Sequence, residues 1–299
     1  MDLKPNYSRY IKKRFQDELV RGYGLISSSF ILMIFGLGAP LILLFVLSFW
    51  SQDHLMLNQT FSIKNYNEFF DNPIYVALLI KSIKIASIVT VISIVLAYPM
   101  AYFISFRIKK NKMLWLVLIT VPFWTSYLLR VFAWKIILGN NGVINSGLIS
   151  LRLIEEPLTF LLYSPIAIII TLAHAWAPFA VLPIYLSLNK INRDLLAAAR
   201  DLGESAFMTF ARVTLPLSLP GIIIASLLVF IPTVGDYVTP SLVGGPQGIM
   251  IGNIIQSMFG ESQNWPMGAT ISMMLIAIVA ILSGLIAWIR YSYHKHGYE

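Results

Sequence analysis

The sequence contains no cysteine and few charged residues. The absence of cysteine among its 299 residues excludes disulfides, thiolate metal ligands and cysteine nucleophiles. Charged residues make up only 12% of the chain, against roughly 25% in an ordinary soluble domain. Because 57% of the residues are hydrophobic, water cannot be the main solvent of this chain. The composition therefore predicts an integral membrane protein.

Motifs for nucleotide binding and for chemistry inside the membrane are also missing. No Gly-x4-Gly-Lys-Ser/Thr phosphate loop is present, so the chain lacks the standard nucleotide cradle. The apolar segments contain no metal-ligand cluster, paired carboxylates or Ser-His-Asp arrangement, which argues against a membrane-embedded enzyme. His174 is a lone imidazole in an apolar segment, and we expect it to be packed and hydrogen-bonded rather than metal-bound. The sequence thus predicts no catalytic residue and no metal site.

Long uncharged apolar runs dominate the rest of the chain. A helix needs about 20 apolar residues to cross the hydrocarbon core, and six runs approach this length. Barrel strands would instead alternate polar and apolar residues over about ten positions. We expect Pro99, Pro122, Pro178 and Pro183 to interrupt their helices. The sequence predicts an all-α membrane protein with six transmembrane helices, over Leu25–Phe49, Ala86–Phe106, Met113–Leu129, Pro165–Leu188, Leu215–Gly235 and Met267–Ile289.

The formal charge of +8 is distributed unevenly between the predicted loops. Sixteen of the 22 Lys and Arg residues fall on the side of the two termini, and only two fall in the loops of the other side. Since positively charged loops remain in the cytoplasm, both termini are predicted to be inside. A nucleic-acid-binding face is the weaker explanation of the charge, and we expect no nucleic acid partner. Lys81 and Lys84 are expected at the outer end of the second span, with their ammonium groups snorkelling.

The predicted inner loop between the fourth and fifth spans is more than a linker. Leu195, Leu196, Ala199 and Leu202 recur at helical spacing, and charged residues occupy positions between them. This pattern is typical of a short amphipathic helix, which Gly203 can end as a C-terminal cap. A cytoplasmic helix of this kind either lies on the membrane or docks on a partner.

The same loop carries a recognisable spacing of small residues. Ala197, Ala198 and Ala199 are followed by three residues and Gly203, then by nine residues and Val213, and shortly afterwards by Leu215-Pro216. This spacing closely resembles the EAA loop of ABC-importer permeases, whose coupling helix sits in a groove of the ATPase subunit. Ala197 replaces the usual glutamate of that family, and Val213 replaces the usual isoleucine. The resemblance implies an ATPase-coupling role for Ala197, Ala198, Ala199, Gly203, Val213, Leu215 and Pro216.

Further stretches are similar to the permeases of the spermidine/putrescine type. Residues 122–135 with 142–145 resemble the signature of the third span, and residues 234–240, 244–246 and 250–253 resemble later segments. The resemblance implies the type I (MetI-like) architecture of ABC-importer permeases, N-in and C-in, as a multi-pass protein of the bacterial cytoplasmic (inner) membrane. A polyamine is the implied solute. Permeases for opines and amino-acid-like compounds look similar, so that alternative stays open.

Importers of this class contain several chains, which the resemblance implies as partners here. They are an ABC ATPase dimer, a second permease subunit and an extracytoplasmic solute-binding protein, with membrane lipid around the spans. ATP and Mg would be bound by the ATPase subunits, and no cofactor by this chain. The organisation then reads as a cytoplasmic segment over residues 1–24, a permease domain over 25–289 with a coupling loop at about 189–216, and a cytoplasmic tail over 290–299.

Two charged residues in or near the spans are candidates for the solute pathway. Counting ~1.5 Å per helical residue places Arg130 and Asp236 at similar depth, near the outer third of the bilayer. In one interpretation, Asp236 accepts a cationic amine while Trp124 and Tyr237 supply aromatic faces. In the other, Arg130 and Asp236 form a structural ion pair. The candidate pathway residues are Trp124, Tyr127, Arg130, Asp236 and Tyr237.

An ion-coupled secondary transporter is the remaining alternative. Such a protein normally buries acidic residues or a histidine relay at mid-membrane. Here every carboxylate lies in a loop or near the end of a span, Asp236 included. The sequence therefore favours the ATP-driven importer.

Overall fold

The computed structural model describes residues 22–24, 26–27, 29–53 and 56–296. Most of the predicted cytoplasmic segment 1–24, with its six basic residues, and the end of the predicted tail 290–299 lie outside the described residues. Within the described part, five helical stretches are long and apolar enough to cross a membrane. Two bent helical stretches, Lys112–Trp124 and Tyr127–Ser150, bring the number to six if they form one span. The prediction of six spans is confirmed in this sense.

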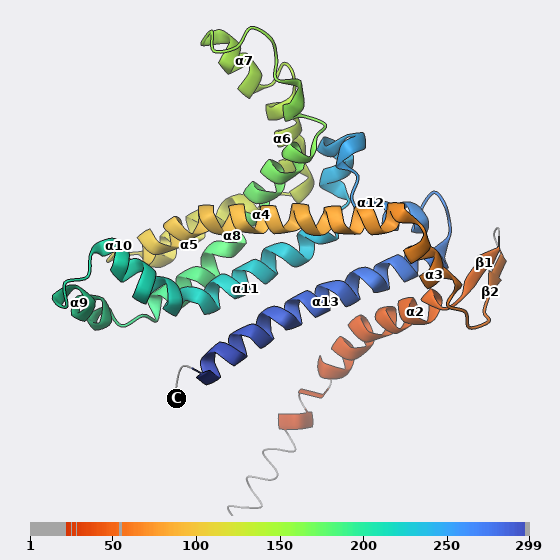
Figure 1. The fold of residues 1–299 in the computed structure, drawn as a ribbon, viewed down its shortest axis with the longest axis horizontal. Helices are drawn as coiled ribbons and strands as arrows, with labels where there is room; N and C mark the ends of the chain where they lie inside the picture. Colours follow the sequence, from red (N-terminus) through yellow and green to blue (C-terminus); the bar gives the residue numbers. More distant parts are fainter. Residues whose placement is uncertain (1–21, 25, 28, 54–55, 297–299) are drawn as a thin grey trace, which may run out of the picture.

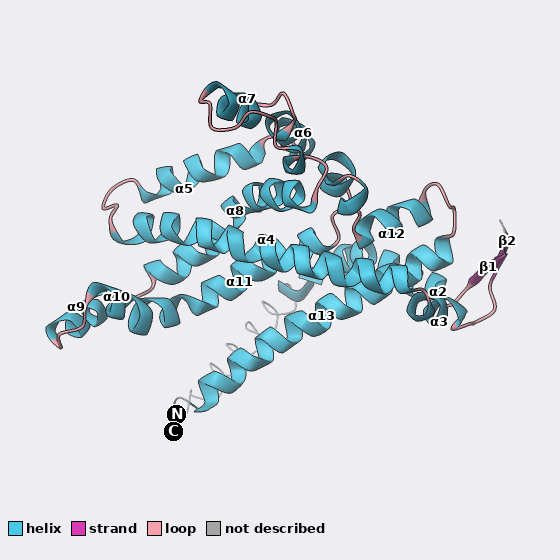
Figure 2. Ribbon diagram, turned by 45° about the horizontal axis from the view of Figure 1, so that its top comes forward, coloured by secondary structure: helices cyan, strands magenta, loops and turns pink. Residues whose placement is uncertain are grey.

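Long helices run side by side and form the body of the molecule (Figures 1 and 2). The first span, Gly22–Ser48, includes a π-helical turn. The elements of the spans are η1 (Ile34–Gly38), α2 (Ala39–Ser48), α4 (Pro73–Phe106), α5 (Lys112–Thr120), η2 (Val121–Trp124), α6 (Tyr127–Leu138), α7 (Val143–Ser150), α8 (Pro165–Asn189), α11 (Leu215–Val234) and α13 (Trp265–His296).

Shorter elements lie at the two ends of this bundle (Figure 1). One end carries α9 (Arg193–Asp201), α10 (Ala206–Thr209) and the π-helical turn η4 (Phe210–Thr214). A small antiparallel hairpin, with Ser51 opposite Asn58, lies at the other end. The elements toward that other end are β1 (Ser51–Asp53), β2 (Met56–Asn58), α3 (Lys64–Asp71), η3 (Thr159–Leu161), η5 (Pro240–Gly244), η6 (Pro246–Gly248) and α12 (Ile251–Phe259).

Hydrogen bonds show that the two predicted inner loops meet at one end of the bundle. The Lys112 ammonium donates to the Ser105 carbonyl at 2.8 Å and to the Asn189 side chain at 3.1 Å. Arg193 also donates to the Ser105 carbonyl, at 3.4 Å. At the opposite end, the Gln52 amide donates to the Gln263 carbonyl at 2.8 Å. These contacts place two predicted inner loops at one end of the bundle and two predicted outer connections at the other.

The core lies where α4, α8 and α11 pack against one another. Small residues let these helices approach closely: a Cβ added to Gly221 would lie 2.4 Å from the Pro183 carbonyl oxygen. Ser93 donates to the Ala173 carbonyl between α4 and α8, at 3.3 Å. Packing of this kind replaces the hydrophobic driving force, which is absent between helices in lipid.

The second span begins earlier than its apolar run suggested. Helix α4 starts at Pro73, with the Asn72 side chain accepting from the Ile74 amide at 3.0 Å, and not at Ala86. Lys81 therefore lies about two turns inside the helix, and its ammonium donates to the carbonyl of Gln247. The Lys81 side chain therefore reaches a backbone carbonyl of the outer connection, which agrees with the expected direction of its ammonium group.

The third span is broken rather than continuous. Helix α5 passes into the 3-10 turn η2 at Val121, directly before Pro122, and α6 restarts at Tyr127 after an extended Thr125. The two halves meet at 81°, so the predicted single span Met113–Leu129 is wrong. The other prolines behave differently, because their helices continue through them. The helices containing Pro99, Pro178 and Pro183 are uninterrupted, and that expectation is also wrong.

Candidate functional site

Arg130 and Asp236 line the same small cavity. Arg130 is in the first turn of α6, just after the break in the third span, and Asp236 follows the end of α11. The cavity has a volume of about 160 Å³. It is lined by Phe123, Tyr127, Arg130, Ala175, Trp176, Pro232 and Asp236. The two charges that the sequence placed at similar depth are thus brought together.

Among the described residues, the Asp236 carboxylate accepts two hydrogen bonds and forms no ion pair. Its Oδ1 accepts from the Val238 amide at 3.0 Å, and its Oδ2 accepts from the Tyr127 hydroxyl at 2.7 Å. Because the Tyr127 proton is engaged with Asp236, the Thr239 hydroxyl is left to donate to the Tyr127 oxygen, 2.5 Å away. These bonds join α6 to the segment that follows α11. Asp236 is therefore fixed in position but not neutralised.

The Arg130 guanidinium is anchored without a carboxylate. Its Nη1 donates to the Ala175 carbonyl at 3.3 Å, and its carbon lies 4.8 Å from the centre of the Phe123 ring. The Tyr127 ring lies on the same group, 5.9 Å away. The buried Nε has no hydrogen-bond partner in the described part of the chain, and no ion pair there joins Arg130 to Asp236. The interpretation of the two residues as a structural ion pair is therefore wrong.

The aromatic faces of the cavity differ from the predicted ones. Trp124 is 86% exposed and does not line the cavity, and neither does Tyr237, which is 46% exposed. The rings that line it are those of Phe123, Tyr127 and Trp176. Phe123 lies four residues before Tyr127 and seven before Arg130, a helical spacing that could have suggested it in place of Trp124. Trp176 was missed, although its depth on the fourth span could have suggested it.

Helix α12 holds the Asp236 segment in place. A Cβ added to Gly252 would lie 2.7 Å from the Gly235 carbonyl oxygen and 2.8 Å from that of Asp236. The Asn253 amide donates to the Tyr237 carbonyl at 3.0 Å and to the Ser241 hydroxyl at 2.8 Å. Gly252 therefore allows the backbone of α12 to approach that of the Asp236 segment, and Asn253 fixes this approach by hydrogen bonds.

A larger, mainly apolar cavity adjoins the small one. It has a volume of about 730 Å³, lies between α4, the broken third span and α8, and shares Phe123 and Arg130 with the small cavity. His174 lines it and accepts a hydrogen bond from the Trp134 indole at 3.1 Å. The expected hydrogen bond of His174 is confirmed, but the expectation that the side chain is packed is wrong, because His174 is exposed. The described residues contain no group of three or more His, Cys, Asp or Glu side chains suited to a metal ion.

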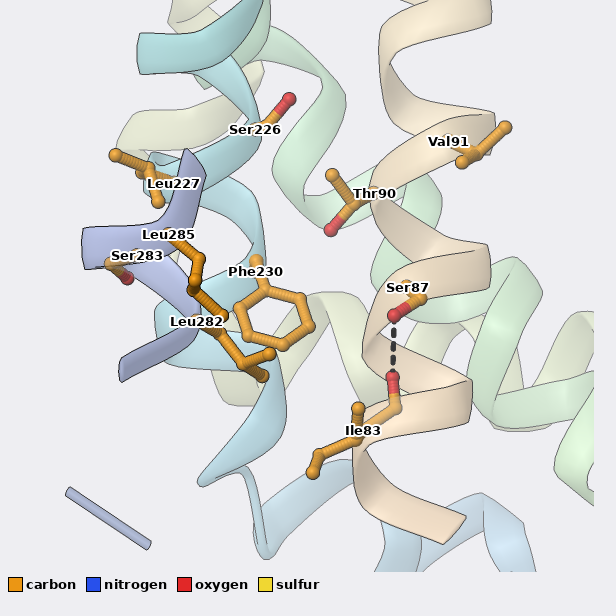
Figure 3. A pocket seen from close by; sticks show the side chains of 10 residues that line it. All are labelled: Ile83, Ser87, Thr90, Val91, Ser226, Leu227, Phe230, Leu282, Ser283 and Leu285. Carbon is orange, nitrogen blue, oxygen red and sulfur yellow. Dashed lines mark hydrogen bonds between the residues drawn. The ribbon is translucent and has the colours of Figure 1, made fainter. Parts of the chain in front are cut away.

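A third cavity, between α4, α11 and α13, offers little to a polar solute (Figure 3). Its volume is about 360 Å³, and leucines of α11 and α13, with Phe230, form one wall. The Ser87 hydroxyl donates to the carbonyl of Ile83 on its own helix, at 2.8 Å (Figure 3). Ser226 and Thr90 each donate to the carbonyl four residues earlier. No charged side chain lines this cavity, so it is a weaker candidate than the site at Asp236.

The predicted amphipathic helix is present as α9. The Asn192 side chain caps its start by accepting from the Asp194 amide at 3.0 Å. At its end, the Gly203 amide donates to Arg200 and the Glu204 amide to Ala199, which is the Schellman pattern. Gly203 has a φ of +87°, a conformation that glycine adopts without strain. The prediction that Gly203 ends the helix is confirmed.

The other residues of the predicted coupling loop lie in α9, in η4 and at the start of α11. Ala199 is buried, while Ala197 and Ala198 are exposed. Val213 lies in the π-helical turn η4, and Leu215-Pro216 form the first turn of α11. Glu204 and Arg212 form an ion pair at 2.6 Å across the turn. The apolar side chains of Leu202 and Phe207 are 86% and 74% exposed, which is a costly arrangement unless something covers them.

Comparison with known proteins gives a consistent result. Residues 26–294 match the family model described as "Binding-protein-dependent transport system inner membrane component". The chain is 37% identical to the spermidine/putrescine transport system permease protein PotB of Haemophilus influenzae, over 84% of this chain and 87% of that protein. It is also 37% identical to PotB of Escherichia coli, over 83% and 90%. The inner membrane ABC transporter permease protein YdcU of E. coli is 32% identical, over 84% of each chain.

Solved structures share the fold at much lower sequence identity. A chain of a bacterial ABC transporter that imports the acidic polysaccharide alginate superposes with a TM-score of 0.70 at 16% identity. The match covers 94% of this chain and 98% of that one. A chain of the alginate transporter in complex with its periplasmic protein gives a TM-score of 0.64 at 17% identity, over 91% and 94%. The fold of the chain is therefore that of ABC transporter membrane subunits.

Proposed function

The chain belongs to the family of binding-protein-dependent transport system inner membrane components, and on this basis we propose that it moves a polyamine, putrescine or spermidine, through the membrane. One observation carries the proposal. Asp236, an anchored carboxylate with no cationic partner in the described part of the chain, lines a cavity with three aromatic rings, and the chain is 37% identical to spermidine/putrescine permeases. A small organic cation is the solute that such a cavity complements.

The chemistry of the cavity suits a protonated amine. An ammonium group entering the cavity would find the Asp236 carboxylate as its counter-charge. The rings of Phe123, Tyr127 and Trp176 present aromatic faces that attract a cation, most strongly where water is excluded. The Tyr127 hydrogen bond keeps the carboxylate in place before the solute arrives. The protein performs no covalent chemistry in this proposal.

We propose that α9 and the following turn couple the permease to a separate ATPase. Exposed Leu202 and Phe207, beside a capped helix at the inner end of the bundle, offer an apolar docking surface. ATP and Mg would bind the ATPase dimer, whose closure would move this loop and rock this chain against a second permease. Residues 189–216 then act as the coupling loop within a permease domain over 25–289, between cytoplasmic segments 1–24 and 290–299. An extracytoplasmic solute-binding protein would deliver the amine to the outer end.

A zwitterionic, amino-acid-like solute is the second candidate. Arg130 lines the same cavity as Asp236 and is not neutralised by it, so the cavity presents both signs of charge. A solute with an ammonium and a carboxylate group would match this arrangement. The polyamine remains the first candidate, because the relatives at 37% identity are named as spermidine/putrescine permeases.

Uptake by the complete importer tests the proposed function. We would reconstitute this permease with its partner permease, ATPase and binding protein, and measure ATP-dependent uptake of radiolabelled putrescine, spermidine and a zwitterionic amino acid. The wild type should accumulate the polyamines, and Asp236→Asn should lose at least about tenfold in initial rate, since it removes the counter-charge. Asp71→Asn, an exposed acid on α3, is the matched control. Uptake of the amino acid alone would replace the polyamine as the solute.

A further inference from the structure

We infer that Arg130 is a specificity-determining residue that lowers the affinity of the cavity for a cation, so that an amine bound near Asp236 is released. The inference rests on the proposed function and deepens it, because it assigns separate roles to the two charges. Asp236 attracts the ammonium group, and Arg130 opposes its capture. No ion pair between the two removes either charge from the cavity in the described structure.

The position of the guanidinium supports this role. The Ala175 carbonyl and the Phe123 ring hold it on the wall of the cavity. It also lies over the ring of Tyr127, the residue whose hydroxyl donates to Asp236. Arg130 and Asp236 are thus both held by neighbouring groups, and both contact Tyr127. A fixed positive charge beside a fixed negative charge weakens the field that either presents to a solute.

A purely structural role accounts poorly for this arginine. A structural arginine in a membrane protein is normally paired with a carboxylate or has its donors satisfied. The buried Nε of Arg130 has no partner among the described residues, and the larger apolar cavity begins on its other side. Keeping an unsatisfied donor beside an apolar cavity costs stability. A functional requirement for the positive charge explains its presence better than packing does.

Transport itself supplies that requirement. A site in a conduction pathway must bind its solute well enough to admit it and weakly enough to release it. A carboxylate beside three aromatic rings would retain an ammonium group strongly. The Arg130 charge reduces that attraction without removing the site. It also disfavours a second ammonium group in the same cavity, so one end of a polyamine occupies the cavity at a time.

The test measures binding and transport separately in the complete complex. Equilibrium dialysis of radiolabelled putrescine against the detergent-purified permease pair with its ATPase, without binding protein, reports affinity for the membrane cavity. Uptake into proteoliposomes with binding protein reports turnover. Arg130→Met should bind putrescine on the order of tenfold more tightly, or about 1.4 kcal/mol, and transport it more slowly. Arg130→Lys keeps the positive charge and should retain the weak binding of the wild type.

Lys135→Met provides the matched control. Lys135 lies on the same helix, its ammonium is 5.7 Å from the centre of the Tyr163 ring, and it does not line either cavity at Arg130. Neutralising it should change neither binding nor uptake. If Arg130→Met assembles with its partners but binds putrescine equally or less tightly, the inference is overturned. A gain of affinity shared by Lys135→Met would also overturn it, because the effect would then not depend on the cavity.

The outcomes also separate this inference from the proposed function. If the wild type takes up polyamines but Arg130→Met gains no affinity, the importer proposal stands and the role of Arg130 fails. If the wild type takes up no polyamine but Arg130→Met gains putrescine affinity, the role of Arg130 stands and the polyamine substrate fails. If neither uptake nor binding of putrescine is observed in any variant, both are overturned.

Discussion

At the scale of single residues, the Tyr127 hydroxyl connects the two breaks that form the site. It donates to Asp236 and accepts from Thr239, so it links α6 to the segment after α11. Hydrogen bonds to charged groups contribute about 1.5–3 kcal/mol each, more than bonds between neutral groups. The Tyr127 hydroxyl and the Val238 amide therefore position the carboxylate together, one on each of its oxygens.

Replacing Tyr127 with phenylalanine should impair transport while leaving the aromatic ring in the cavity. We expect Tyr127→Phe to reduce the initial rate of polyamine uptake by roughly tenfold, since one hydrogen bond to the carboxylate is lost. The measurement is uptake into proteoliposomes at saturating binding protein. Tyr163→Phe, which removes the hydroxyl of a tyrosine in the loop before α8, is the control. Equal uptake by wild type and Tyr127→Phe would show that the bond to Asp236 is not needed.

The two tryptophans distinguish the structure from the sequence prediction. Trp176 lines the cavity, whereas Trp124 is largely exposed and lies outside it. Trp176→Phe should keep most of the uptake rate, and Trp176→Ala should lose severalfold, because the aromatic face is removed. Trp124→Ala should transport like the wild type. A lower uptake rate for Trp124→Ala than for Trp176→Ala would contradict this assignment and support a role of Trp124 in the solute pathway.

At the scale of the element, the end of α9 depends on the backbone of one glycine. The φ of +87° at Gly203 costs most other residues about 1–2 kcal/mol, and asparagine is the best tolerated of them. No atom lies within 4 Å of an added Cβ, so the strain would come from the backbone alone. The substitution series is therefore a test of conformation rather than of packing.

Gly203→Val should uncouple or destabilise the loop, and Gly203→Asn should be close to the wild type. We expect the valine variant to lose most ATP-dependent uptake while the permease still inserts in the membrane, because the Schellman turn is strained. Binding-protein-stimulated ATPase activity of the complex should fall in parallel. Full stimulation in Gly203→Val would mean that the geometry of this turn plays no part in coupling.

The third span shows the same dependence of function on an element's shape. The break at Pro122 turns α6 by 81° from the preceding helix and places Phe123, Tyr127 and Arg130 on one cavity. A straight helix would also carry these residues on one face, since positions i, i+4 and i+7 fall on the same stripe, so the break changes the direction of that face rather than gathering the residues. The prolines of α4 and α8 produce no such break. The break therefore decides where this shared face points relative to the neighbouring spans.

At the scale of the whole molecule, the two ends of the bundle face different compartments. The segment that contains Lys110 lies at the end of the bundle that carries α9. The loop that contains Glu261 lies at the opposite end, which carries the β-hairpin. Because the sequence has no cysteine, single cysteines can be introduced without background labelling. Both positions are exposed.

Labelling with a membrane-impermeant maleimide should distinguish the two ends. Glu261→Cys should react in cells whose outer face is accessible, and Lys110→Cys only after the inner membrane is permeabilised, because the positive loops remain inside. Labelling of denatured samples controls for expression of both variants. The reverse pattern would invert the topology and place α9 on the wrong side for an ATPase.

The sequence by itself determined the features that depend on local composition and spacing. Apolar run length predicted the number of spans, and the asymmetry of positive charge predicted the orientation. The amphipathic spacing after residue 193 located α9, and Gly203 marked its end. It also placed Arg130 and Asp236 at similar depth, because depth in a helix follows from counting residues. These inferences use only positions along the chain.

Only the tertiary structure decided how these residues face one another. Counting gives depth but not direction, and the direction of a side chain after a break depends on the angle between the two helical halves. Phe123 lines the cavity and Trp124 does not, and α8 adds Trp176. The same geometry left Arg130 and Asp236 unpaired on one cavity, because Tyr127 and the Ala175 carbonyl hold them separately.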